Sequence, residues 1–267
     1  MPPVQEAAPI AAPMATGHAF MTACDPLVHI DRVEPNADLR LVATVNGASV
    51  IRLAGVDLPQ LGDSGLAAER APLIDETRAV MAAIEQHSAC LEPREAHTDR
   101  YGRLPVQVFA RDGAWLQASL LRLGLARVRP TADSRPFIAE MLSIEAGARA
   151  RGVGLWREPE FAVRRATDPG PIDGSYQIVE GRVTDASRHG NRWYINFGDD
   201  WRDDFTVIIP VQALKLFEAA GMKPYSLKGR DVRVRGWVET LNGPMIEALL
   251  PEQIELTDGG QPTNAGQ

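Results

Sequence analysis

Two arginines and one aspartate stand at the ends of apolar segments. Arg52 opens the apolar segment 51–56 and Asp57 follows it, while Arg103 comes after a Tyr-Gly turn and leads into the apolar segment 104–110. Guanidinium groups match phosphate oxygens with paired hydrogen bonds, and carboxylate oxygens are ligands that calcium prefers. These residue types in this placement therefore point to a site that holds a phosphodiester against a metal ion.

The order of these residues resembles the thermonuclease (staphylococcal nuclease-like) family. The resemblance runs from about Leu27 to Trp156. It includes segment 115–128, which is similar to the family's second helix and its exit, and segment 145–156, which is similar to its last helix and closing tryptophan. The resemblance implies a barrel of the OB type with three helices. It also implies a calcium-dependent nuclease that hydrolyses phosphodiester bonds of DNA or RNA with little sequence specificity.

Within this resemblance, Asp57 takes the place of a calcium ligand and Asp38 that of its neighbour in the metal site. Arg52 and Arg103 take the two phosphate-binding positions, where they would neutralise charge that builds on the phosphate oxygens. The family's water-activating glutamate corresponds to Gln60, which can orient a water molecule but cannot accept its proton. Losing a general base typically slows a reaction by about 10²–10⁴, so weakened hydrolysis is expected.

Further residues are candidates for substrate contact. Tyr101, in the turn before Arg103, would contact a phosphate or stack on a base. Arg127 and Arg129 stand where the family has a base-stacking tyrosine, so any nucleotide contact there would be made by charge. Asp63, on the glycine-rich loop after Gln60, is a candidate replacement base, although a turn residue is the stronger interpretation.

Structural interpretations stay open beside these roles. Arg52 or Arg103 could pair at the barrel rim with an acid such as Glu69 or Asp99. Asp38 could simply begin a strand. The hypothesis of a metal site therefore depends on these side chains converging.

The bulk composition is that of an ordinary globular protein. Apolar residues make up 45% of the chain and charged residues 24%, and the formal net charge is −7. Because neither half of the chain is basic, broad electrostatic attraction to nucleic acid is not expected, and phosphate contacts must come from local arginine clusters. No apolar run is long enough to span a bilayer. The five histidines and two cysteines lack zinc-ligand spacing.

The compartment is open from the sequence. The first twenty-odd residues lack the basic start and the apolar stretch of a secretory signal. In a barrel of this family's type the first and fourth strands are neighbours, so a disulfide between Cys24 and Cys90 is geometrically possible, with two buried thiols as the alternative. We expect an exported or periplasmic protein if that disulfide forms and a leader is missing, and a cytoplasmic one otherwise.

Hydrophobic alternation predicts the elements that must position the candidate site. The fold class is mainly β with α. In the first part of the chain, strands are expected at 27–33, 39–45, 50–56, 89–92 and 104–110, and helices at 75–84, 114–123 and 135–150. This order predicts an OB-type barrel covered by three helices.

Beyond the barrel, strands are expected at 176–185, 192–197, 205–209, 231–239, 245–249 and 253–256, with a helix at 211–220. Three strands, a helix and further strands are the order of a second OB-fold-like barrel. The domains are therefore a flexible segment at 1–24, a thermonuclease-like domain at 25–157, a linker at 158–174, an OB-fold-like domain at 175–257 and a disordered tail at 258–267.

The expected partner is DNA or RNA, most readily single-stranded. Exposed aromatic residues in the second domain could stack on bases, but the acids Asp199, Asp200, Asp203 and Asp204 would repel phosphate there. The alternative function is a non-catalytic module of two OB-type barrels that binds nucleic acid, or a protein through its C-terminal domain. The oligomeric state is open.

Overall fold

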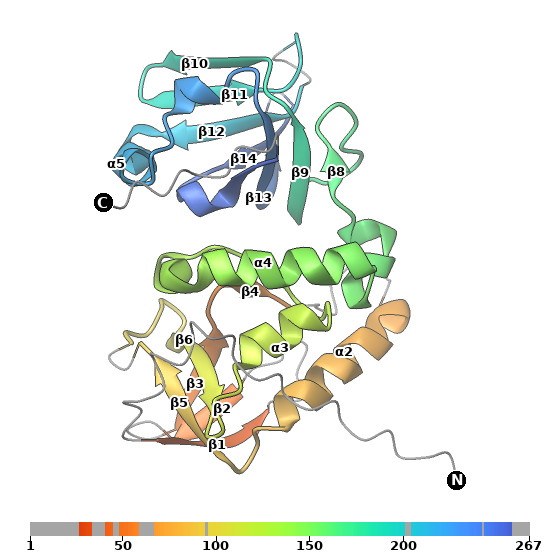
Figure 1. Ribbon diagram of the computed structural model, residues 1–267, viewed down its shortest axis with the longest axis vertical. Helices are drawn as coiled ribbons and strands as arrows, with labels where there is room; N and C mark the ends of the chain where they lie inside the picture. Colours follow the sequence, from red (N-terminus) through yellow and green to blue (C-terminus); the bar gives the residue numbers. More distant parts are fainter. Residues whose placement is uncertain are drawn as a thin grey trace. The chain divides into compact units, whose positions relative to one another are not determined.

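The computed structural model describes residues 27–33, 41–44, 48–58, 67–93, 96–200, 204–241 and 243–257. The chain divides into two compact units, Met1–Glu158 and Pro159–Gln267 (Figure 1). The expectations of a flexible start at 1–24 and a disordered tail at 258–267 concern residues outside the described part. No helix within the described ranges is both long and apolar enough to cross a membrane.

The first unit contains a closed five-stranded barrel, as the sequence predicts. Its strands, in spatial order, are β1 (Val28–Val33), β2 (Leu41–Thr44), β3 (Ala48–Leu53), β6 (Arg103–Ala110) and β5 (Ser88–Glu92). Neighbouring strands are antiparallel except β3 and β6, which run parallel. Apolar side chains such as Ile30, Ile51 and Val108 fill the core. The parallel pair matters for function because it carries both Arg52 and Arg103.

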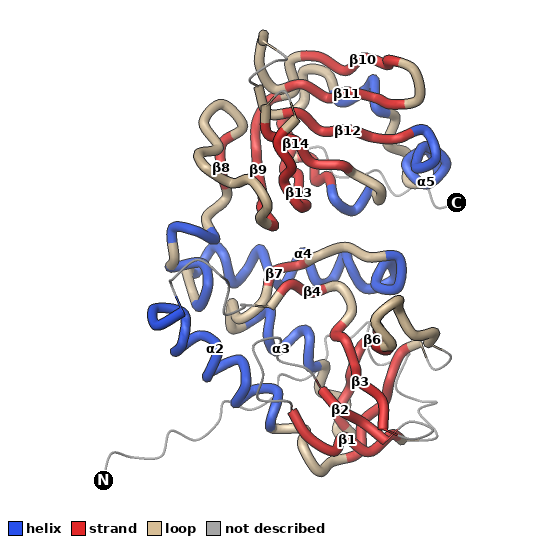
Figure 2. Tube along the Cα trace, turned by 180° about the vertical axis from the view of Figure 1, so that it is seen from behind, coloured by secondary structure: helices blue, strands red, loops and turns tan. Residues whose placement is uncertain are grey.

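In the described part of this unit, three helices and short 3₁₀ turns accompany the barrel (Figure 2). They are α2 (Ala67–Ala82), α3 (Leu116–Arg122) and α4 (Arg135–Arg151), with the 3₁₀ turns Ala132–Ser134 and Gly154–Arg157. Helix α2 begins eight residues before the predicted start at 75. Pro72 lies inside it and suggests a helix boundary in the sequence. The helix continues through Pro72 because Ile74 and Met81 are buried in the core and anchor its apolar face.

The predicted strand 50–56 is two strands in the structure. Strand β3 ends at Leu53, a turn follows at Ala54 and Gly55, and β4 (Val56–Asp57) then pairs with β7 (Arg127–Val128) outside the barrel. Gly55 has a φ of 83°, and a Cβ there would lie 2.8 Å from the Cβ of Ser134. Only glycine suits this turn. The turn therefore places Arg52 and Asp57 on different ladders.

A buried network of polar side chains supports this turn. Gln107 donates from Nε2 to the carbonyl of Ala54 at 3.0 Å and accepts from Nε1 of Trp115 at 3.0 Å. Gln117 bonds to the backbone of β6 at Val106 and Val108. Since these buried polar groups are paired, they join β3, β6 and α3 rigidly beneath the candidate site.

The second unit is built on one eight-stranded sheet. Its strands are β8 (Arg164–Arg165), β9 (Tyr176–Arg182), β10 (Asp185–His189), β11 (Arg192–Asn196), β12 (Thr206–Pro210), β13 (Asp231–Thr240), β14 (Pro244–Glu247) and β15 (Ile254–Leu256). The spatial order is β10-β11-β12-β14-β13-β9-β8, with β15 on β13. Helix α5 (Leu214–Ala219) lies in sequence between β12 and β13, together with the 3₁₀ turns Val211–Ala213 and Pro224–Leu227. Two further 3₁₀ turns, Pro159–Phe161 and Pro251–Gln253, precede β8 and β15.

This order is consistent with an OB-like barrel. Strands β9 and β10 are successive in the chain, yet β9 pairs with β13 and β10 pairs with β11. The chain therefore passes from β9, which lies between β13 and β8, to β10 at the opposite end of the sheet. The parallel pair β12 and β14 corresponds to the parallel pair β3 and β6 of the first unit.

Two predicted boundaries in this unit were wrong. The expected strand 176–185 breaks at Val183 and Thr184, where the chain bends from β9 into β10. The expected linker 158–174 contributes to the second unit. Its strand β8 runs parallel to β9, and Ala166 and Ile172 are buried in the core. The many prolines and charged residues of this segment predicted a linker, although a few apolar residues pack it against the sheet.

Cys90 on β5 is disulfide-bonded. The other cysteine of the sequence, Cys24, lies outside the described residues.

Candidate functional site

Arg52 and Arg103 lie side by side on the parallel pair β3 and β6. Val50 is the register partner of Arg103, and Pro105 is that of Arg52. Because side chains two positions apart point to one face of a strand, the two arginines share a face. Both reach the same atom, Oδ2 of Asp99. Arg103 contacts it at 2.9 Å from Nε and 2.8 Å from Nη2, and Arg52 contacts it at 3.6 Å from Nε.

Asp99 holds this arrangement through the turn it begins. Its Oδ1 accepts hydrogen bonds from the backbone N–H of Tyr101 at 2.9 Å and of Arg103 at 3.1 Å. Partial burial raises the pKa of Asp99, but the hydrogen bonds from Arg103 and Tyr101 outweigh it, so the pKa lies below the ordinary value of 3.8. The carboxylate is therefore ionised at neutral pH and acts as the counter-ion of both guanidiniums. The pairing with Asp99 that the sequence left open for Arg52 and Arg103 is present.

Arg129 adds a third positive charge beside Arg52. Burial lowers the pKa of Arg52, the charges of Arg103 and Arg129 lower it further, and Asp133 and Asp99 oppose this shift. Asp133 Oδ2 lies 3.2 Å from Nη2 of Arg52. We call Arg52, Arg103 and Arg129 the arginine cluster. Arg52 and Arg103 both contact Asp99, and Arg52 also contacts Asp133, so guanidinium groups gather at one place where an anionic ligand would meet hydrogen-bond donors.

Tyr101 stands at the exposed edge of this cluster. Its side chain belongs to a residue that is 64% exposed. The guanidinium carbons of Arg100 and Arg103 lie 4.9 and 4.8 Å from the centre of its ring. An exposed ring with cations beside it can stack on a base while the cations contact phosphate. The expected role of Tyr101 in substrate contact stays a prediction.

Asp57 is engaged elsewhere. Its Oδ2 accepts a hydrogen bond from Nη2 of Arg127 at 2.7 Å, and the two side chains are only 13% and 5% exposed. Asp57 and Arg127 are direct register partners in the β4–β7 pair. The expectation that Arg127 contacts substrate was wrong, because β7 turns this side chain into a buried ion pair with Asp57. Arg129, the other arginine of that segment, lies close enough to Arg52 to lower its pKa.

The described residues alone do not fit a calcium ion. Asp57 is already neutralised by Arg127, and no group of three or more histidine, cysteine, aspartate or glutamate side chains gathers among the described residues. The other expected contributors, Asp38, Gln60 and Asp63, lie outside the described residues, as does the side chain of Glu69. A cation at Asp57 would have to displace a guanidinium.

Sequence reasoning missed two features of this site. The first is the contact of Asp133 with Arg52. The buried pair of Asp57 and Arg127 was also missed. A signal was present for the second feature, since Arg127 and Arg129 alternate with the buried Val128 as residues of a strand do.

We expect acid to weaken the first unit partly through Asp99. Its pKa is lower in the folded state than in the unfolded state, so its stabilisation is fully present above about pH 4 and is lost as the pH falls through the folded value. An Asp99→Asn variant should therefore show a flatter fall in the free energy of unfolding on acidification. Urea titrations at about pH 5 and about pH 3 measure this difference, and equal falls in both proteins would contradict it.

A family model described as staphylococcal nuclease homologue matches residues 50–158. The matched residues include most of β3, all of β4, the turn that begins at Asp99, and helices α2 to α4. No curated protein matches the chain.

Proposed function

We propose, from the match of residues 50–158 to the staphylococcal nuclease homologue model, that this protein binds the phosphodiester backbone of DNA or RNA at the arginine cluster and hydrolyses it slowly. The observation that carries the proposal is the convergence of Arg52 and Arg103 on one oxygen, at 3.6 and 2.8 Å. A phosphate oxygen in the same position would receive donors from both arginines.

The proposed roles of Arg52, Arg103 and Tyr101 follow from their contacts, and that of Gln60 follows from its place in the sequence. Arg52 and Arg103 bind phosphate oxygens and stabilise the charge that grows on them during hydrolysis. Arg129 adds attraction from the same side, and Tyr101 stacks on a base. Gln60 orients the attacking water by hydrogen bonding. Since glutamine cannot take the proton, hydrolysis is slow, and little sequence preference is expected because phosphate contacts carry no base information.

The proposal is tested with denatured DNA and single-stranded RNA. Arg52→Ala/Arg103→Ala should reduce cleavage by at least the factor of about 10²–10³ that loss of one transition-state donor typically gives. Arg182→Ala is the matched control, because Arg182 is an exposed arginine of the second unit that pairs with Asp231. The assays are run with calcium and with chelator. Equal cleavage by wild type and the double variant would refute the proposal.

A second candidate is a module that binds nucleic acid without cleaving it. The buried pair of Asp57 and Arg127 favours this function, because the carboxylate of Asp57 is already paired with a guanidinium. Such a module should bind single strands with a salt dependence that weakens by about one unit of slope for each arginine removed. It should release no cleaved product in either metal condition. A protein partner for the second unit belongs to the same alternative.

We also infer an oxidising compartment, because Cys90 is disulfide-bonded and disulfides persist outside the reducing cytosol. Mass measurement of the protein from its native host, before and after thiol alkylation, tests this inference. Two alkylated cysteines without prior reduction would contradict it.

A further inference from the structure

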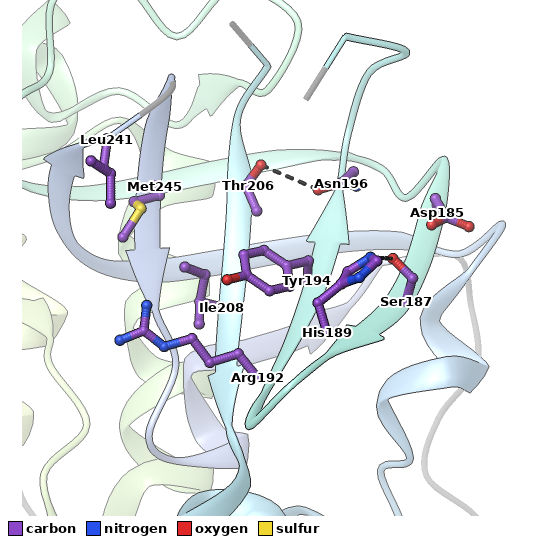
Figure 3. A pocket seen from close by; sticks show the side chains of 10 residues that line it. All are labelled: Asp185, Ser187, His189, Arg192, Tyr194, Asn196, Thr206, Ile208, Leu241 and Met245. Atoms are coloured by element: carbon purple, nitrogen blue, oxygen red, sulfur yellow. Dashed lines mark hydrogen bonds between the residues drawn. The ribbon is translucent and has the colours of Figure 1, made fainter. Parts of the chain in front are cut away.

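The second unit has a hollow on the outer face of its sheet. It has a volume of about 630 Å³ and is lined by residues of β10, β11, β12 and β14, with Leu241 from the turn before β14 (Figure 3). None of these residues belongs to the arginine cluster. The hollow lies on the side of the sheet opposite the core, because the intervening residues Ile195, Val207 and Ile246 are buried inside.

Strand register arranges the lining in rows. In one row, Ser187 faces Tyr194, which faces Ile208. In the row toward Asp185, Asn196 faces Thr206, which faces Met245. On the other side of Tyr194, His189 faces Arg192. The hollow therefore has an aromatic and apolar centre, a polar side and a basic side.

The centre suits a flat, uncharged ring. The ring of Tyr194 is half-buried, and its neighbours Ile208, Met245 and Leu241 are apolar. Such a floor can hold a nucleobase by stacking and by apolar contact. Figure 3 shows the Tyr194 ring lying between Ile208 and His189.

The polar side suits the edge of such a ring. Thr206 Oγ1 donates to Oδ1 of Asn196 at 3.3 Å, which fixes the amide in place. The amide nitrogen of Asn196 and the second acceptor position of its oxygen remain able to face a ligand. An amide beside an aromatic floor is the chemistry that reads a base edge.

The basic side suits a single phosphate. Within the part of the chain that the structure describes, Arg192 makes no ion pair. His189 shares a hydrogen bond with Ser187, whose Oγ lies 3.3 Å from Nε2 of the histidine. Asp185, at the far side, is paired with Lys228 at 2.8 Å. The charge of Asp185 is thus neutralised by Lys228, while the guanidinium of Arg192 is able to pair with an anionic ligand.

Surrounding acids limit how much phosphate can bind. Glu247 is the register partner of Ile208, and Glu239 that of Met245. Asp199 and Asp200 follow the end of β11. These charges would repel the phosphates of a long strand laid across the sheet. One nucleotide with its phosphate at Arg192 avoids most of them.

We propose that this hollow binds one nucleotide, with its base on Tyr194, its base edge at Asn196 and its phosphate at Arg192 and His189. The ligand is either a free nucleoside monophosphate or the end nucleotide of a single strand, since both present the same chemistry. The site shares no residue with the proposed nuclease site and does not depend on hydrolysis.

The test uses the full chain in an Arg52→Ala/Arg103→Ala background, so that the arginine cluster contributes neither binding nor cleavage. Calorimetric titrations compare adenosine and uridine monophosphates with ribose 5-phosphate, which lacks a base, and with adenosine, which lacks the phosphate. Short single strands with and without a terminal phosphate form the second arm. We expect the monophosphates to bind more tightly than either fragment, and the two arms distinguish a free nucleotide from a strand end.

Variants then locate the site. Tyr194→Leu keeps an apolar side chain in the sheet and should weaken binding about tenfold or more, as loss of base stacking does. Arg192→Ala should weaken the monophosphates but not adenosine. Tyr225→Leu and Arg182→Ala, at exposed positions outside the hollow, should leave binding unchanged.

Circular dichroism checks that each variant is folded, and Arg192→Ala stands as the deciding variant if Tyr194→Leu unfolds. Absence of monophosphate binding at millimolar concentration, or binding that Arg192→Ala leaves unchanged, overturns the proposal.

Discussion

Replacing Arg127 by alanine is expected to lower the free energy of unfolding of the first unit by about 3–5 kcal/mol. The reason is the environment of the pair. Arg127 and Asp57 are 5% and 13% exposed and lie 2.7 Å apart. Removing the guanidinium leaves the Asp57 carboxylate mostly buried without its ion-pair partner, which is far more unfavourable than losing a surface contact.

Amide hydrogen exchange of β6 and α3 measures this loss in the full chain, because these buried elements belong to the first unit alone. Arg111→Ala is the matched control, since Arg111 is exposed, and its effect should stay within about 0.5 kcal/mol. The double variant Asp57→Leu/Arg127→Met should recover much of the stability, because an apolar pair replaces a buried ionic one. A loss below about 1 kcal/mol for Arg127→Ala would mean that the pair behaves as a surface salt bridge.

Restoring a carboxylate with Gln60→Glu is expected to raise the rate of phosphodiester cleavage by about 10²–10⁴. A glutamate can accept the proton of the attacking water, which glutamine cannot do. Initial rates on a single-stranded DNA substrate, with and without calcium, measure the gain. The gain should disappear when Arg52→Ala/Arg103→Ala is combined with Gln60→Glu, because proton transfer needs a bound phosphate.

Two further variants interpret this result. Asp63→Ala should leave the rate of Gln60→Glu unchanged if Asp63 is a turn residue, and should lower the wild-type rate if Asp63 serves as the replacement base. A Gln60→Glu protein that still cleaves nothing, while binding strands at the arginine cluster, would show that the domain is a binding module.

The barrel and its helices could be predicted from the sequence because their signals are local. Apolar residues and turn residues such as Gly102 mark β3 and β6. The family resemblance suggested that Arg52 and Arg103 act together, and the parallel register of the two strands places them side by side. The partner of Asp57 could not be predicted in the same way. Its ladder with Arg127 is only two residues long and joins positions 70 residues apart.

The division of strand 50–56 explains why the structure places Asp57 away from Arg52. An unbroken strand would carry Asp57 along the direction of Arg52, whereas the left-handed Gly55 turns the chain toward β7. Glycine in an apolar run signals a bend or a bulge, but not its direction. The interpretation of segment 158–174 as a linker was wrong for a related reason. The burial of Ala166 and Ile172 depends on strands that come later in the chain.

The turn at Asp99 also has an entropic consequence. Long arginine side chains lose rotamer freedom when they grip a ligand, at about 0.5–1.5 kcal/mol for each one immobilised. Asp99 already forms ion pairs with Arg52 and Arg103, and Asp133 forms one with Arg52. Much of the rotamer freedom of these two arginines is therefore lost during folding. A phosphate bound there, as proposed, would meet preorganised donors, and ordering the protein would reduce its binding energy less.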